Sequence, residues 1–210
     1  MLRKIGRKAA ASIALGAAFA CVLLAGIEVE KVPNPRERDG SWVQDSGGVL
    51  GEEYIALIND VCRSLNAATS TEMAVVTVDN LAGMTIEDYA ERLFRRFGIG
   101  LKGRDNGLLL LFSRDDRMVR LEVGYGLEAV VPDGLASRIL DEEAVPRFRE
   151  GEYGRGLYEA AAAVARAVAS DAGVPLDIAA PTAWPSPVVP PVPQASDTVK
   201  EKAPGALSGS

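Results

Sequence analysis

Polar side chains flank both ends of one strongly apolar stretch in "KGRDNGLLLLFSRDDR", residues 102–117. Its centre, Leu108–Phe112, is five apolar residues in a row, which predicts a central strand covered on both faces. The flanks should therefore emerge at opposite ends of a sheet. The side chains at these flanks that could bind or react are Asp105, Asn106, Asp115, Asp116 and Arg117. Carboxylate and carbonyl oxygens gathered by turns suit Ca²⁺, which takes six to eight oxygen ligands.

The surrounding sequence predicts the elements that must position these residues, in the order α-β-α-β-β-α-α. Two strands are joined by a helix and should be parallel, and the short connection 113–117 should turn the third strand back antiparallel. The sequence thus predicts an α/β fold with a small mixed β-sheet sandwiched by helices on both faces. The predicted strands are 73–78, 108–112 and 118–124, and the predicted helices are 54–65, 85–97, one from near Asp133 and one from near Gly154.

This topology collects polar residues at two ends of the sheet. At one end the returning strand finishes beside the Asp-Asn-Gly turn, and at the other the first strand ends near the hairpin. The first candidate metal site is Asp105, Asn106, Glu128 and Asp133, and the secondary candidates are Asp79, Asp115, Asp116 and Arg117. Purely structural roles compete with both sites, because Asp-Asn-Gly is a common turn, Asp133 could be an N-cap and a charged hairpin is usually solvated.

Composition excludes several function classes. The chain has no histidine and two distant cysteines, Cys21 and Cys62, which excludes histidine-dependent catalysis and zinc sites. Any metal should be Ca²⁺, or Mg²⁺ or another hard divalent cation. Residues 9–210 carry 19 basic and 29 acidic side chains, which argues against nucleic acid as a partner. "GYGLEA" at 124–129 resembles a dinucleotide fingerprint, but Val130-Val131-Pro132 opposes the helix that it requires, so no nucleotide is expected.

The N-terminal segment predicts the location. A basic start is followed by 19 apolar or small residues, Ala9–Ile27, about the length that spans a bilayer. The positive end should stay in the cytoplasm, which predicts a single-pass signal anchor in the cell membrane with the domain outside the cytoplasm. Cleavage at Ala18-Phe19-Ala20, giving a secreted or periplasmic protein, and lipid modification of Cys21 are the alternatives.

Proline placement predicts the boundaries of the domain. Residues 1–27 are the signal anchor or signal peptide, and 28–44, which include Pro33 and Pro35, are expected to be a linker. The folded domain is expected at 45–172. Eight of the 12 prolines lie between Pro175 and Pro204, so 173–210 are expected to form a disordered Pro-rich tail.

Four sequence blocks resemble the TPM domain family, which includes thylakoid photosystem II repair proteins and bacterial membrane-anchored proteins of the YgcG type. The blocks are "DSGGVL", "GIGLKGRDNG", "GYGLE" and "PRFREGEYGRGL", and the resemblance covers about residues 43–170. It implies an α/β sandwich with a mixed sheet, binding of calcium or a similar cation near the acidic loops, and the acid phosphatase activity reported for plant members. Asp105 and Asn106 match the family's D-N-G motif, Glu128 its G-L-E motif, and 115–117 its hairpin.

The sequence departs from many members of the family at two places. Its ending is Pro-rich, where they carry a further membrane span or a Gly-rich tail, and Ser46-Gly47 replaces the commoner Glu or Gln followed by Ala. The difference in the tail bears on the partner more than on the fold.

Two functions of different classes follow. The first is a membrane-tethered, cation-binding module that assists assembly, repair or quality control of a membrane protein complex. The second is a metal-assisted acid phosphatase, in which Asp105 or Asp116 attacks the phosphorus or activates water. Phosphoryl transfer needs cationic groups around the phosphate. The sequence divides its basic residues between the two ends of the sheet, which favours the binding module.

Overall fold

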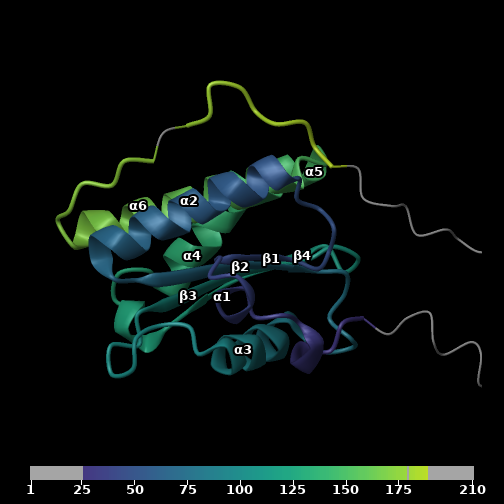
Figure 1. Cartoon of the computed structure of the whole chain (residues 1–210), viewed down its shortest axis with the longest axis horizontal. Helices are drawn as coiled ribbons and strands as arrows, with labels where there is room; N and C mark the ends of the chain where they lie inside the picture. The colour runs from purple at the N-terminus through teal and green to yellow at the C-terminus, as the bar shows by residue number, and fades with distance from the viewer. Residues whose placement is uncertain (1–25, 179, 189–210) are drawn as a thin grey trace, which may run out of the picture.

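The computed structural model describes residues 26–178 and 180–188 (Figure 1). The expected signal anchor or signal peptide therefore lies almost wholly outside the described residues, as does the tail beyond residue 188. None of the helices in the described part of the chain is long and apolar enough to cross a membrane.

The sheet has four strands in the order β1-β2-β3-β4: Val43–Asp45, Glu72–Val78, Gly107–Ser113 and Met118–Val123. The first three are parallel and β4 is antiparallel to β3. This confirms the mixed sheet and the three predicted strands. Strand β1 was not predicted, because three residues are too few to show a period.

Helices cover both faces of the sheet, as predicted. Figure 1 shows α2 and α6 on one face of the sheet and α3 on the other. Alternate residues of the two central strands belong to the two cores: Val75 and Leu110 to the core under α2 and α6, and Val76 and Leu109 to the core under α3. The helices are α1 Pro35–Arg38, α2 Glu52–Thr69, α3 Ile86–Phe97, α4 Asp133–Ile139, α5 Val145–Arg149 and α6 Tyr153–Asp171, with 3₁₀ turns η1 Val29–Lys31 and η2 Tyr125–Leu127 and a π-helical turn η3 Leu140–Ala144.

The segment 28–44 is not a free linker, which corrects the expectation. Val29 and Val32 are buried in the core under α3, and their carbonyl oxygens accept hydrogen bonds from Arg96 Nη1 at 2.9 and 2.6 Å. Pro35 begins α1 rather than breaking structure, because its missing N–H would have no partner at that position anyway. The sequence pattern does not predict this packing, because Val29 and Val32 contact residues that lie far away in the sequence.

The first part of the Pro-rich tail is also packed, contrary to the expected disorder. Residues 180–188 return along the outer face of α2 and α6 (Figure 1). The Trp184 ring lies edge-on to Tyr158 with centroids 5.6 Å apart and under the Arg155 guanidinium at 4.5 Å. The Tyr54 hydroxyl donates to the carbonyl of Pro185 at 3.1 Å. An aromatic ring with polar neighbours thus fixes this stretch.

Candidate functional site

The predicted site residues lie at two edges of the sheet. We call the edge where β2 and β3 begin and β4 ends the amino edge, and the edge where β1, β2 and β3 end the carboxyl edge. The strand pairing places 105–106 and 124–128 at the amino edge, and Asp79 and the hairpin 114–117 at the carboxyl edge. Both groupings follow the prediction from topology.

At the amino edge, Asn106 has a structural task. Its side chain is buried, and its Oδ1 accepts from the backbone N–H of Leu101 at 2.9 Å while its Nδ2 donates to the carbonyl of Ser70 at 2.8 Å. These bonds tie the loop before β3 to the end of α2. The amide at this position is therefore explained by folding alone, since a buried polar group must be paired.

Two glycines allow the loop before β3 and the loop after β4 to approach each other closely. The backbone N–H of Gly126 donates to the carbonyl of Asp105 at 3.0 Å, and a Cβ added at Gly126 would lie 1.9 Å from the carbonyl oxygen of Arg104. A Cβ at Gly124 would lie 2.3 Å from the carbonyl oxygen of Asp105. The two loops therefore meet through backbone atoms, as predicted from topology. The side chains of Asp105, Glu128 and Asp133 are exposed instead. Asp133 is the first residue of α4, and Pro132 occupies the N-cap.

At the carboxyl edge, Asp45 organises the loop between β1 and α2. Its two carboxylate oxygens accept from the backbone N–H groups of Val49 and Leu50 at 3.1 and 3.0 Å, and the Thr77 hydroxyl also donates to it. Asp45 was not among the predicted site residues. The signal that could have found it is its place in "DSGGVL", where an aspartate precedes glycines and a helix.

Asp79 and Asp116 are held in the same way, each by one oxygen. Asp79 Oδ1 accepts from the backbone N–H of Ile27 at 3.2 Å and of Asn80 at 2.9 Å. Asp116 Oδ2 accepts from the backbone N–H of Leu81 at 2.8 Å and from Ser113 Oγ at 2.6 Å. Within the described residues, the other oxygen of each carboxylate has no hydrogen-bond partner. Each carboxylate is therefore oriented and still has a free acceptor.

The hairpin joins these groups to β2. The backbone N–H of Asp115 donates to the carbonyl of Asp79 at 2.8 Å. The Asp115 carboxylate is paired with Arg114 at 2.7 Å, which raises the pKa of the Arg114 guanidinium above its usual value, and Arg114 also donates to the carbonyl of Gly47. Asp115 is consequently neutralised, whereas Arg117, in the left-handed conformation at φ 55°, has no ion pair within the described residues.

The chemistry open to these groups is limited. In the part of the chain that the structure describes, no group of three or more His, Cys, Asp or Glu side chains could hold a metal ion. A cation at either edge would therefore need carbonyl and water oxygens beside one or two carboxylates. Cys62 is fully buried, and burial raises the pKa of its thiol, so it is not a reactive nucleophile.

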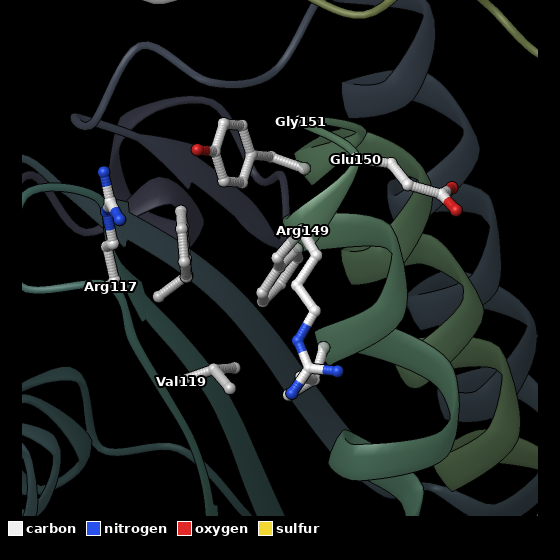
Figure 2. A pocket seen from close by; sticks show the side chains of 9 residues that line it. Arg117, Val119, Arg149, Glu150 and Gly151 are labelled. Atoms are coloured by element: carbon white, nitrogen blue, oxygen red, sulfur yellow. The ribbon is translucent and has the colours of Figure 1, made fainter.

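A pocket of about 590 Å³ opens between the β3–β4 hairpin and α5 (Figure 2). Its floor is aromatic and aliphatic, and Arg117 on the hairpin and Arg149 at the end of α5 flank it. It is lined by Phe112, Arg117, Val119, Val145, Phe148, Arg149, Glu150, Gly151 and Tyr153. Of these, only Arg117 was predicted as a site residue. The lining comes from two stretches, 112–119 and 145–153, and no pattern in the sequence shows that they face each other.

Comparison with solved structures identifies relatives of the fold. The chain is similar to the N-terminal domain of a P. gingivalis protein, with 37% identity and a TM-score of 0.65 over 69% of this chain and 93% of that one. It shares its fold with the N-terminal domain of the cg2496 protein of Corynebacterium glutamicum (16% identity, TM-score 0.52, 64% of this chain and 84% of that one). The same holds for the BA42 protein of Bizionia argentinensis (21%, 0.51, 58% and 82%).

Comparison with curated proteins finds no match. A family model described as the TPM domain matches residues 43–167, more than half of the sequence. The match starts at β1 and ends inside α6, so it covers both edges of the sheet and the pocket. The chain belongs to the TPM domain family.

Proposed function

We propose that this protein is a membrane-tethered, extracytoplasmic binding module that takes up a divalent cation at the carboxyl edge and assists assembly, repair or quality control of a membrane protein complex. The observation that supports it is the pair Asp79 and Asp116. Each is fixed through one carboxylate oxygen and keeps the other free. The tether is the apolar run Ala9–Ile27.

The donor set fits a hard cation. Two carboxylate oxygens, with carbonyl oxygens of the surrounding turns and water, are the ligands that Ca²⁺ accepts in its adaptable geometry. Mg²⁺ would fit less well, because it demands near-octahedral order and holds its waters. With only two carboxylates the affinity should be weak, on the order of 10⁻⁴–10⁻³ M, the range of extracellular calcium modules.

The amino edge is the competing location. Asp105, Glu128 and Asp133 are exposed and keep their carboxylates free of hydrogen bonds within the described residues, but no backbone N–H orients any of them. Ordering three flexible side chains around an ion would cost conformational entropy that the carboxyl edge has already lost on folding. We therefore place the cation at Asp79 and Asp116.

Calcium titration of the full chain in zwitterionic nanodiscs tests this placement, with empty nanodiscs as the reference. Asp79→Asn and Asp116→Asn should each weaken binding about tenfold or more, because a hard cation loses a formal charge at close range. The matched amino-edge variants Asp105→Asn and Asp133→Asn should bind as the wild type does. The reverse pattern would move the site to the amino edge. If calorimetry detected no calcium binding by the wild type or any variant, the cation would be removed from the proposal.

A metal-assisted acid phosphatase is the second candidate, and one observation favours it. Arg117 follows Asp116 directly and has no ion pair within the described residues, so a cationic group stands beside a candidate nucleophile. The other arginine of the hairpin, Arg114, is neutralised by Asp115. Efficient phosphoryl transfer depends on several preorganised cationic groups around the phosphate. The binding module is therefore the better supported function.

A further inference from the structure

We propose that the pocket between the β3–β4 hairpin and α5 binds a small organic anion with a planar apolar body and one carboxylate or phosphate group. The proposal does not depend on the cation site, which uses other side chains. It rests on the pocket's floor, on its volume and on the two arginines that flank it (Figure 2).

The floor is a cluster of three aromatic rings. Phe112 is buried, and its centroid lies 4.6 Å from that of Phe148 and 5.2 Å from that of Tyr153. Phe148 and Tyr153 are 5.7 Å apart and only half-buried, so their rings are open to the pocket. Aromatic rings in tilted arrays at these distances add a further planar group favourably. The floor thus selects an aryl body over a branched or polar one.

The volume sets the size of the ligand. About 590 Å³ lies in the middle of the range for pockets that enclose small molecules, which is roughly 300–1,000 Å³. Val119 from β4 and Val145 from α5 also line the hollow, so apolar contacts come from both the sheet and the helical side. A molecule with one or two fused rings and a charged group would fit within such a space.

The charge at the rim selects an anion. Arg117 and Arg149 are exposed, and neither has an ion pair or hydrogen-bonded side-chain partner within the described residues. Nearby arginines differ: Arg147 and Arg155 share the carboxylate of Glu159 at 2.8 and 2.9 Å. Within the described residues, both guanidinium groups are therefore available to pair with an anion at the pocket.

One carboxylate, that of the exposed Glu150, also lines the pocket, 3.7 Å from Arg147, so the lining carries two positive charges and one negative charge. The guanidinium fork matches carboxylate and phosphate geometry and can bond either of them bidentately. A ligand with its aryl body on the three rings and its anionic group at the rim would therefore satisfy both features at once.

The test uses 2-naphthoate and 1-naphthyl phosphate as probes, with the full chain in zwitterionic nanodiscs. Affinities come from titration calorimetry, and saturation-transfer NMR shows that the aryl protons contact the protein. Both probes should bind at least tenfold more tightly than 2-naphthalenemethanol, which lacks the charge, and than inorganic phosphate, which lacks the rings. Equal affinity for 2-naphthalenemethanol would overturn the anion requirement. Tighter binding of laurate than of 2-naphthoate would overturn the planar body and indicate an acyl chain, as a lipid would supply.

Variants locate the probe. Arg117→Gln and Arg149→Gln should each weaken 2-naphthoate about fivefold or more and leave 2-naphthalenemethanol unchanged. Arg92→Gln is the matched control, because Arg92 is an exposed arginine on α3, on the opposite face of the sheet. Wild-type affinity in both pocket variants would overturn the assignment.

Salt dependence gives a readout that needs no variant. Raising NaCl from 50 to 500 mM should weaken 2-naphthoate several-fold, because exposed charges are screened, without weakening 2-naphthalenemethanol. Equal salt dependence of the two probes would contradict pairing with the arginines.

Discussion

Similar polar residues have different roles at the two edges of the sheet. At the amino edge, polar side chains and glycines hold the backbone. Asn106 is buried and hydrogen-bonded through both its oxygen and its nitrogen, and Gly126 lets two loops touch, while the carboxylates project into solvent. At the carboxyl edge the carboxylates do the holding, and Asp79 and Asp116 each keep one oxygen free. The comparison teaches that backbone N–H groups can orient an acidic side chain and still leave one of its oxygens able to accept a bond.

The largest expected loss of stability comes from a substitution at the amino edge. Gly126→Ala places a Cβ 1.9 Å from the carbonyl oxygen of Arg104, so backbone must move apart, and the free energy of unfolding should fall by about 2–3 kcal/mol. Gly134→Ala is the control, since nothing lies within 4 Å of its Cβ and alanine favours a helix. Urea unfolding measures both. A loss in Gly126→Ala no larger than in Gly134→Ala would show that the loops are not tightly packed.

The next largest loss of stability is expected from a substitution at the carboxyl edge. Asp45→Ala removes the acceptor for two backbone N–H groups and the Thr77 hydroxyl, and should cost about 2 kcal/mol of unfolding free energy. Asp133→Ala at the amino edge should cost less than about 1 kcal/mol, because Asp133 is exposed, makes no capping hydrogen bond and stabilises α4 only by its charge. Thermal or urea unfolding should rank the two. Equal costs would contradict the difference between the edges.

The smallest effect concerns the residue that holds the chain near Asp79. The Tyr89 hydroxyl donates to the carbonyl of Ile27 at 2.6 Å, and Tyr89→Phe should cost about 1 kcal/mol at pH 7. Burial, together with the negative charges of Asp79 and Glu30, raises the pKa of Tyr89 above its usual value near 10. Above about pH 10 the unfolded tyrosine loses its proton while the folded one keeps it, so stability should fall as pH rises.

Tyr89→Phe should make this alkaline loss shallower. Some slope should remain, because burial also raises the pKa values of Cys62, Tyr54 and Tyr158. Unfolding free energies at intervals from pH 8 to 11 give the slope for each protein. If the variant lost stability with rising pH as steeply as the wild type, Tyr89 would not be a source of the alkaline loss.

Much of the fold could be predicted because its main elements are long and regular. The stripe of α3 and the unbroken apolar run of β3 each show their period within one segment, so their type and pairing followed. Strand β1 and the packed segment 28–44 could not be predicted in this way. Val32 is fully buried, but what buries it is α3, more than fifty residues later.

The candidate site was predictable in place but not in detail. Topology was enough to group Asp79 with the hairpin and Asp105 with Glu128. It could not show that Asp45 is a structural acceptor, that Asp115 is neutralised, or that Asp116 keeps a free oxygen, since these depend on individual hydrogen bonds. The pocket was less accessible still, because Phe112, Phe148 and Tyr153 meet only in the folded chain.

The hydrogen bond from Ile27 to Asp79 would limit how far the domain could move from a membrane anchor placed before Ile27. A free linker over 28–44 could have extended roughly 60 Å and let the domain search a hemisphere above its anchor. In the folded chain that segment is packed, and Ile27 is fixed at the carboxyl edge by Asp79 and Tyr89. If the apolar run before Ile27 is embedded in a bilayer, the proposed cation site would lie against the lipid surface, with almost no flexible chain between the two. Partners would be met by sideways diffusion within the plane of the membrane rather than by reaching out from it.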